Sequence, residues 1–245
     1  MASRKLRLDD LLVSEGRFAS RDEVLRAVVA GEVLVDEVRV SSPALKVAPD
    51  AAVRVVYKGP YVSRGGEKLA GGLAAFALDV QGLRCIDCGC STGGFTDCLL
   101  QHGAAHVAAV DVGYGDFSMK LRRDARVALF ERTNIREADP ATLGAPFDLA
   151  VADVSFAPLH SYIDAVVAFL APGGHFLTLV KPQFEAARSE VGEGGVVVDP
   201  AVHARVLADA KSCFEAHGLA VLGSCESPIR GRKGNKEYLL LGRLG

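Results

Sequence analysis

The fold is decided by the stretch CIDCGCSTGGF, which occupies residues 85–95. Its first residues are apolar, as in a buried strand, and the stretch continues into the apolar periodicity of a helix. Glycines between a strand and a helix let a ligand approach the backbone, and the free N–H groups at the helix N-terminus favour polar ligand atoms. The glycine spacing, Gly89-x-x-x-Gly93-Gly94, differs from the G-x-G-x-x-G fingerprint of dinucleotide-binding folds, so a nicotinamide cofactor is disfavoured.

Segments of strand and helix character alternate around this stretch, which is typical of a parallel sheet. Seven strands are expected, near residues 84–87, 106–111, 127–131, 147–153, 174–181, 220–225 and 236–242. Helices are expected at residues 67–77, 93–102, 158–171 and 200–217. The predicted fold class is therefore α/β, with a Rossmann-like seven-stranded sheet. The glycine-rich segment 189–195 is expected to be a mobile loop over the site.

The N-terminal part of the chain predicts a separate, small α+β domain. Two helices and three strands are expected there, at residues 8–16, 21–31, 33–35, 38–40 and 53–57. The residues Lys58-Gly59-Pro60-Tyr61 form a turn-rich joint. The expected division of the chain is therefore a small domain, a linker and a large domain, at residues 1–58, 59–63 and 64–245.

Composition limits the class of protein. The 245 residues are 49% hydrophobic, enough for a sizeable core, and the formal charge of −2 excludes a uniformly basic protein, so any nucleic-acid surface must be a local patch. The N-terminus meets two acids before any apolar run of signal-peptide length, and no apolar stretch reaches the ~20 residues that span a bilayer. Neither secretion nor a membrane anchor is expected, and the predicted location is the cytoplasm.

Cysteine usage points the same way. The chain has six cysteines, at positions 85, 88, 90, 98, 213 and 225. With a core that needs no covalent support, they are expected to be reduced thiols. A metal site at Cys85-x-x-Cys88-x-Cys90 is disfavoured, because Cys85 lies in an apolar strand and no second ligand pair follows at zinc-site spacing. Packing is the preferred interpretation, and no metal is predicted.

Polar residues at strand ends suggest an adenosyl site. Asp111 ends the second strand, where its carboxylate could accept hydrogen bonds from both hydroxyls of a ribose. Asn134, after the third strand, is a candidate for the adenine edge, although a simple turn asparagine is an equal alternative. The candidate cofactor-binding residues are Asp87, Gly89, Ser91, Thr92, Gly93, Gly94, Phe95, Asp111 and Asn134. A structural turn without any ligand is the alternative for the whole set.

Two parts of the chain resemble known families. Arg7-Leu8-Asp9, Ser20-Arg21-Asp22 and the run from Gly31 to Asp36 resemble the S4-type RNA-binding domain, and the remainder is similar to FtsJ-like ribose methyltransferases. In this order, with VSRGGEKL at residues 62–69, the chain resembles the TlyA family, whose members carry both the name hemolysin and the name ribosomal RNA 2′-O-methyltransferase. The resemblance implies S-adenosyl-L-methionine as cofactor and a cytidine ribose of ribosomal RNA, within ribosomal subunits, as target.

The resemblance also implies a catalytic tetrad. FtsJ-like enzymes use Lys-Asp-Lys-Glu, and the matching positions are Lys68, Asp153, Lys181 and Glu237. A ribose hydroxyl is a poor nucleophile, so a methyltransferase must position it and remove its proton. A lysine does so only when neutral, and a nearby cation and partial burial favour that form. We expect Lys181 to accept the proton, Lys68 to supply the neighbouring charge, and Asp153 and Glu237 to orient both lysines and the hydroxyl.

Basic residues are the candidates for RNA contacts. In the first domain these are Arg4, Lys5, Arg7, Arg17, Arg21 and Arg26, and around the catalytic mouth they are Arg64, Arg230, Arg232 and Lys233. Residues 1–60 hold ten Lys/Arg and nine Asp/Glu, a net of +1, so this domain must present its basic side selectively. Ordinary surface charge is the alternative for each.

Three rival functions stay open. A membrane-active hemolysin predicts a spanning or amphipathic membrane segment, and neither is found in the sequence. A non-catalytic RNA-binding assembly factor would not need the intact tetrad. A base-directed methyltransferase would carry other polar motifs beside the fourth strand than Asp153-Val154-Ser155-Phe156. No obligatory protein partner is evident.

Overall fold

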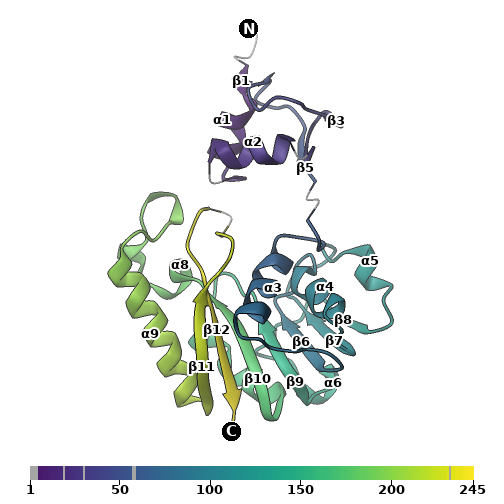
Figure 1. Ribbon diagram of the computed structural model, residues 1–245, viewed down its shortest axis with the longest axis vertical. Coiled ribbons are helices and arrows are strands. Elements are labelled where there is room, and N and C mark those ends of the chain that lie inside the picture. Colours follow the sequence, from purple (N-terminus) through teal and green to yellow (C-terminus); the bar gives the residue numbers. More distant parts are fainter. Residues whose placement is uncertain (1–4, 19, 30, 57–58, 232) are drawn as a thin grey trace. The chain divides into compact units, whose positions relative to one another are not determined.

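The computed structural model describes residues 5–18, 20–29, 31–56, 59–231 and 233–245. Its contacts divide the chain into two compact units (Figure 1). The smaller unit comprises Met1–Gly59 with Arg230–Asn235, and the larger comprises Pro60–Ile229 with Lys236–Gly245. Within the larger unit, Pro60 O accepts a hydrogen bond from Gln101 at 2.9 Å, so the predicted linker, residues 59–63, contains a residue tied to that unit. The domain limits at 58 and 64 stay a prediction.

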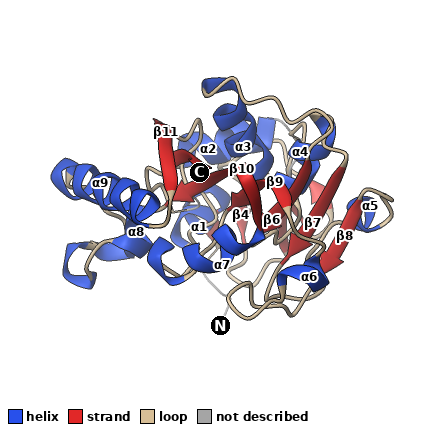
Figure 2. Ribbon diagram, turned by 90° about the horizontal axis from the view of Figure 1, so that it is seen from below, coloured by secondary structure: helices blue, strands red, loops and turns tan. Residues whose placement is uncertain are grey.

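The larger unit is built on a seven-stranded sheet with the order β11-β12-β10-β9-β6-β7-β8 (Figure 2). Its strands are β6 Arg84–Cys88, β7 His106–Val110, β8 Val127–Phe130, β9 Phe147–Ala152, β10 Leu170–Val180, β11 Leu219–Glu226 and β12 Tyr238–Leu244. Five neighbouring strands run parallel, whereas β12 is antiparallel to both β10 and β11. The prediction of seven strands is confirmed, and the parallel arrangement expected from the alternation of strands and helices does not extend to β12. The reason is that β12 returns from β11 without a crossover helix.

The helices of the larger unit differ from prediction in length, and the three short helices α5, α6 and α8 were not predicted. They are α3 Gly65–Ala75, α4 Gly94–Gln101, α5 Met119–Arg122, α6 Pro140–Leu143, α7 Ile163–Phe169, α8 Pro182–Glu185 and α9 Pro200–Ala216. The predicted helix 158–171 is instead a 3₁₀ turn η1, Leu159–Ser161, followed by α7, and β10 already begins at Leu170. The segment 189–195 contains most of two 3₁₀ turns, η2 Arg188–Glu190 and η3 Glu193–Gly195.

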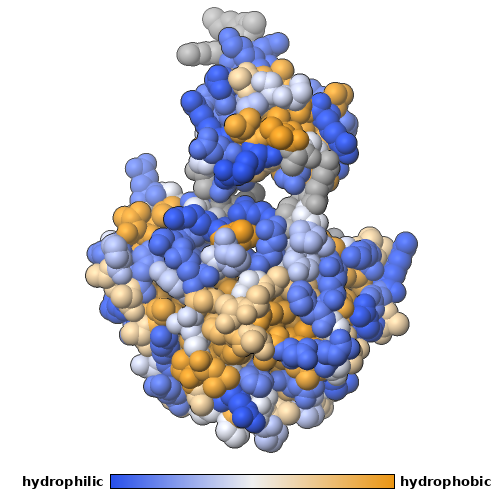
Figure 3. Space-filling model, in the orientation of Figure 1, coloured by the Kyte–Doolittle hydropathy of each residue, from blue (hydrophilic) through white to orange (hydrophobic). Residues whose placement is uncertain are grey.

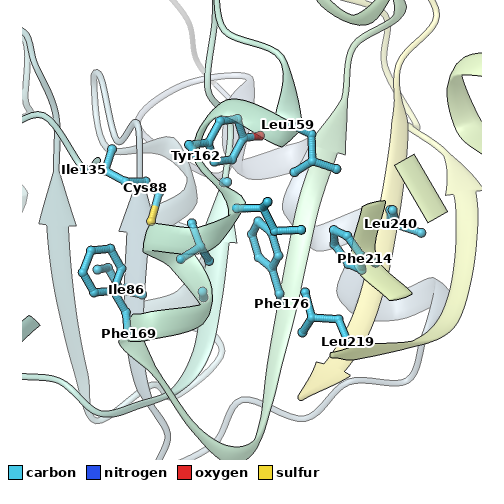
Figure 4. Packing of buried hydrophobic residues seen from close by; sticks show 14 of the residues in the cluster. Ile86, Cys88, Ile135, Leu159, Tyr162, Phe169, Phe176, Phe214, Leu219 and Leu240 are labelled. Atoms are coloured by element: carbon cyan, nitrogen blue, oxygen red, sulfur yellow. The ribbon is translucent and has the colours of Figure 1, made fainter. Parts of the chain in front are cut away.

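Two hydrophobic cores lie on the two faces of this sheet. Residues of α3, α4 and α5 belong to one core, and residues of α7 and α9 belong to the other. Along β7, Val107 and Ala109 face the first core while Ala108 and Val110 face the second, as the two-residue period of a strand requires. Figure 4 shows the second core, in which Phe176 stacks on Phe214 at 5.1 Å between ring centroids. Burial on both faces makes the sheet a rigid support for residues at its strand ends.

The smaller unit is an α+β arrangement, as predicted. Its elements are β1 Leu6–Arg7, α1 Leu8–Ser14, α2 Arg21–Val29, β2 Val33–Val35, β3 Val38–Arg39, β4 Lys46–Val47 and β5 Val53–Val55. The expected hairpin is β2–β3, whose turn residues Asp36 and Glu37 both have positive φ, and β5 pairs with β2. The antiparallel pair β1–β4 was not predicted. On the face drawn in Figure 3, hydrophilic residues surround an apolar patch of this unit.

Candidate active site

The glycine loop, residues 88–94, connects β6 to α4 and requires glycine for two physical reasons. Gly89 and Gly93 have φ values of +83° and +92°, in the left-handed region that side chains disfavour. A Cβ on Gly93 would also lie 2.5 Å from Leu121 Cδ1. On Gly94 it would lie 2.9 Å from Gly66 N, so glycine allows α4 to pack on α3. The predicted strand, glycine loop and helix are confirmed.

Asp111 follows β7 and orders the chain around a hollow. Its Oδ2 accepts a hydrogen bond from Ser91 N at 2.8 Å, and its Oδ1 accepts one from Gly113 N at 2.7 Å. The hollow encloses about 250 Å³, including solvent at its mouth, and is lined by Cys90, Ser91, Asp111, Gly113, Tyr114, Asp116, Phe117 and Glu131. Each oxygen of Asp111 retains a lone pair for a ribose hydroxyl.

Several lining residues were missed by sequence reasoning. Tyr114 is exposed, and the Arg132 guanidinium lies 4.1 Å from its ring centroid. Glu131 Oε1 accepts a hydrogen bond from Gly115 N at 2.7 Å and pairs with Arg122, whose hydrogen bond lowers the pKa of Glu131. The available signal was the sequence Gly-Tyr-Gly shortly after Asp111, which offers an aromatic ring on a permissive backbone.

Asp87 lies in β6, fully buried beneath the glycine loop. Its Oδ2 accepts hydrogen bonds from Thr96 N at 2.9 Å and Thr96 Oγ1 at 2.6 Å, whereas its Oδ1 has no hydrogen-bond partner. Burial raises the pKa of Asp87 to about 7, against the opposing effect of the Thr96 hydrogen bonds. Asp87 Oδ1 is therefore left as a hydrogen-bond acceptor for a donor group of a ligand bound above β6.

Three other predicted cofactor residues have different surroundings. Phe95 is buried in the core between the sheet and α3–α4, where it packs rather than lines the hollow. Asn134 donates to Glu137 Oε1 at 2.8 Å and accepts from Arg136 N at 3.2 Å, so it forms a local turn, the alternative weighed for it above. Thr92 is exposed, and its carbonyl accepts a hydrogen bond from Ser118 N at 3.2 Å.

The four tetrad residues come together as two ion pairs. Lys68 Nζ lies 2.6 Å from Glu237 Oε2, and Lys181 Nζ lies 2.5 Å from Asp153 Oδ1. Lys68 is on α3, whereas the other three lie where β9 ends, where β10 ends and where β12 begins. In the sheet, Ala152 pairs with Thr178 and Val180 pairs with Tyr238, so these three ends are neighbours.

Burial and hydrogen bonds hold both lysines. The side chains of Lys68 and Glu237 are 11% and 3% exposed, and those of Lys181 and Asp153 are 7% and 23% exposed. Lys181 Nζ also donates to Ser155 Oγ at 3.0 Å and, more weakly, to the carbonyl of Asp153 at 3.4 Å. Each lysine thus has a carboxylate as its ionic partner, in keeping with the orienting role expected for Asp153 and Glu237.

Phe156 is a further residue that sequence reasoning missed. Its side chain is 89% exposed, and its φ of +64° is a conformation that a bulky residue rarely adopts. It lies three positions after Asp153, and its ring centroid is 5.2 Å from that of Phe184 on α8. A strained, exposed aromatic ring beside the ion pairs offers a stacking face to a planar group.

Three of the predicted RNA-binding arginines of the smaller unit have partners within that unit. Arg7 forms two hydrogen bonds with the buried Asp9, at 2.9 and 2.6 Å, and Arg21 pairs with Asp10. Arg17 donates to the carbonyl of Val53 at 2.8 Å and lies 3.6 Å from Glu15. Their charges are therefore partly neutralised within the unit.

The other residues predicted to contact RNA differ in solvent exposure, and two of them lie outside the described residues. Lys5, Arg26, Arg230 and Lys233 are exposed and Arg64 is half-buried. Arg4 and Arg232 lie outside the described residues.

The cysteines confirm the packing interpretation. Cys85, Cys90 and Cys98 are buried in one core of the larger unit and Cys88 in the other, while Cys213 and Cys225 are half-buried. Burial raises the pKa of the Cys85 and Cys98 thiols to about 12, which keeps them protonated. In the part of the chain that the structure describes, no group of three His, Cys, Asp or Glu residues is arranged to hold a metal ion.

The fold and the site define a Rossmann-like methyltransferase. A solved S-adenosylmethionine-dependent methyltransferase from Mesorhizobium loti shares this fold at a TM-score of 0.53 and 18% identity, over 72% of this chain and 97% of that one. Family models for the S4 domain and for FtsJ-like methyltransferases match residues 6–53 and 61–244.

More similar relatives specify the group. The 16S/23S rRNA (cytidine-2′-O)-methyltransferase TlyA of Mycobacterium tuberculosis is 45% identical over 97% of this chain and 90% of the relative. Hemolysin A of Brachyspira hyodysenteriae is 39% identical over 96% of this chain and 98% of the relative. A solved hemolysin-named protein from Streptococcus thermophilus superposes at a TM-score of 0.81 with 39% identity, over 99% of this chain and 90% of that one. The chain belongs to the FtsJ-like methyltransferase family, in the S4-containing group that includes TlyA.

Proposed function

We propose that this protein transfers the methyl group of S-adenosyl-L-methionine to the 2′-hydroxyl of a cytidine in ribosomal RNA. The observation that carries the proposal is the meeting of Lys68, Asp153, Lys181 and Glu237 at three neighbouring strand ends and one helix. The choice of cytidine and ribosomal RNA comes from the name of the M. tuberculosis relative. Such an enzyme would act where ribosomes are assembled, so we also propose a cytoplasmic location.

The residues around the glycine loop fit the proposed cofactor. Asp111 would accept hydrogen bonds from the ribose hydroxyls, and Ser91 and Gly113 line the hollow next to it. The unpartnered Oδ1 of Asp87 is a buried acceptor for a donor such as the cofactor's ammonium group. When bound, the cofactor supplies an electrophilic methyl group on a sulfonium.

The protein's own task in this reaction is to hold and deprotonate the ribose hydroxyl. Lys181 would accept the proton when neutral, and Asp153 and Ser155 fix the position of its Nζ. Glu237 would hold Lys68 at the same site. Single-turnover methylation should therefore rise with pH between about 6 and 9, and a flat profile with chemistry rate-limiting would count against a lysine base.

RNA binding would involve both units. The S4-type domain and the basic residues predicted above would contact phosphates, which position an RNA without reading its sequence. Phe156 would stack on the base of the target nucleotide once it leaves the RNA stack, since aromatic rings bind unstacked bases. Stacking holds any base, so we assign Phe156 to binding strength and not to the choice of cytidine.

The deciding experiment is to incubate the protein with ribosomal subunits and labelled cofactor, and to locate the methyl group by mass spectrometry. We expect 2′-O-methylcytidine with the wild type and none with Lys181→Ala. A methyl group on a base would contradict the reaction and leave the fold untouched. Dye release from liposomes by the purified protein would instead favour the membrane activity that the name hemolysin implies. Among the helices that the structure describes, none combines the length and the apolar character needed to span a bilayer.

A further inference from the structure

Unpaired polar atoms mark the active site. In the described part of the chain, three buried side-chain atoms have no hydrogen-bond partner: Asp87 Oδ1, Gln183 Oε1 and Asp153 Oδ1, of which the last lies 2.5 Å from Lys181 Nζ in an ion pair. Leaving a buried acceptor unpaired costs free energy, and folded proteins retain such atoms mainly where function requires them. Asp87 and Asp153 are already part of the proposed site, whereas no role has been given to Gln183.

The orientation of the Gln183 amide follows from its neighbour. Gln183 lies on α8, two residues after Lys181, and its Nε2 donates a hydrogen bond to Glu237 Oε1 at 3.2 Å. An ionised carboxylate only accepts hydrogen bonds, so the amide must turn its N–H group toward Glu237 and its oxygen away. The other oxygen of Glu237 holds Lys68. Gln183 thus donates to Glu237 through Nε2, while its Oε1 has no hydrogen-bond partner.

We propose that Gln183 is a positioning residue of the methyl-transfer site, which acts by holding the Glu237 carboxylate in the orientation that directs Lys68. This inference rests on the proposed function. A packing role would require only the volume of the side chain, whereas a positioning role requires a hydrogen-bond donor at the place of Nε2. The two roles are therefore separable by substitution.

Two variants distinguish these roles. Gln183→Met keeps the length of the side chain and removes the donor, and we expect it to lower kcat about tenfold, the effect of one hydrogen bond to a charged group. Gln183→Glu replaces the amide with a carboxyl group, which donates to Glu237 when protonated and repels it when ionised. The ratio of its kcat to the wild-type kcat should rise as the pH falls from about 8 to 6.

The charged groups on the elements that carry Glu237 and its partners are common to the wild type and the variants, so the ratio of the two kcat values cancels their titration. They are Arg64 before α3, Glu67 and Lys68 on α3, Asp153 after β9, Lys181 before α8, Glu185 on α8, Glu226 on β11 and Lys236 before β12. Gln81→Met, on an exposed turn, is the matched control, with an expected kcat within twofold of the wild type.

The measurement is single-turnover methylation of ribosomal RNA with the full chain, together with the thermal midpoint of each variant. A tenfold loss in Gln183→Met at an unchanged midpoint, with acid rescue of Gln183→Glu, supports the proposal. A kcat of Gln183→Met within twofold of the wild type, or a ratio for Gln183→Glu that does not change with pH, would overturn it. A wild type that methylates no ribose would refute the proposed function instead.

Discussion

Removing one partner of the Lys68–Glu237 ion pair tests whether this buried pair stabilises the folded protein. The two atoms are 2.6 Å apart, and both side chains are nearly excluded from solvent. Glu237→Gln removes the negative charge at constant shape and leaves the Lys68 ammonium without its counter-ion. Removing one partner of a buried pair costs about 3–5 kcal/mol, and we expect about 3 kcal/mol because Lys68 retains some contact with water.

The double variant separates the pair from its environment. Replacing both partners, as Lys68→Met with Glu237→Gln, removes the uncompensated charge, and similar replacements are often close to neutral. We therefore expect the double variant to be more stable than Glu237→Gln alone, with a coupling energy of about 2–3 kcal/mol between the two positions. Methylation should be lost in Glu237→Gln, in Lys68→Met and in the double variant.

The assay is urea unfolding followed by far-ultraviolet circular dichroism without cofactor. The matched control is the exposed pair of Lys236 with Glu226, 3.3 Å apart with side chains 43% and 49% exposed, which should contribute no more than about 1 kcal/mol. If Glu237→Gln costs no more than Glu226→Gln, the charges at the site are not held as a buried pair and the electrostatic reasoning fails.

Three further outcomes are expected. Asp87→Asn should remove a pH dependence of stability in the cofactor-free protein. Because burial raises the pKa of Asp87 to about 7, the contribution of this group to stability is present below about pH 4 and is lost as the pH rises toward 7. The midpoint of urea unfolding should therefore change less between about pH 4 and 7 in the variant than in the wild type. Phe156→Ala should raise the KM for ribosomal RNA several-fold with little change in the KM for the cofactor, since one stacked base contributes about 1–3 kcal/mol. Phe156→Trp should keep the wild-type KM for ribosomal RNA. If Phe156→Ala also keeps that KM, stacking on Phe156 is excluded. Gly93→Ala should abolish cofactor binding in calorimetry and lower the thermal midpoint, because its Cβ would meet Leu121 at 2.5 Å in a left-handed backbone; unchanged binding would mean that the loop adapts.

The cofactor loop could be predicted because local sequence encodes it, whereas the four tetrad positions were taken from the resemblance to FtsJ-like enzymes. Each apolar strand that ends in a polar residue places that residue at the sheet edge where ligands bind, as for Asp111, Asp153 and Lys181. Helices α5, α6 and α8 were missed because four residues are too few to show a helical period.

Contacts between distant segments could not be predicted. Arg21 was assigned to RNA for its charge, yet Asp10, which precedes it by 11 residues and lies on the other helix, is beside it in the fold and pairs with it. Exposure is likewise absent from sequence, so Phe156 looked like any apolar residue after a strand. Both cases depend on three-dimensional neighbours that a one-dimensional pattern does not contain.

The direction of β12 explains how the tetrad closes. Ligand sites in parallel sheets are built from residues that follow a strand, as Asp153 follows β9 and Lys181 follows β10. Because β12 runs antiparallel to β10, its beginning lies beside the end of β10, and Val180 pairs with Tyr238. Glu237, which precedes its strand, therefore reaches the same edge and can bind Lys68 and Gln183. A β12 parallel to β10 would carry Glu237 to the opposite edge and leave Lys68 without its carboxylate.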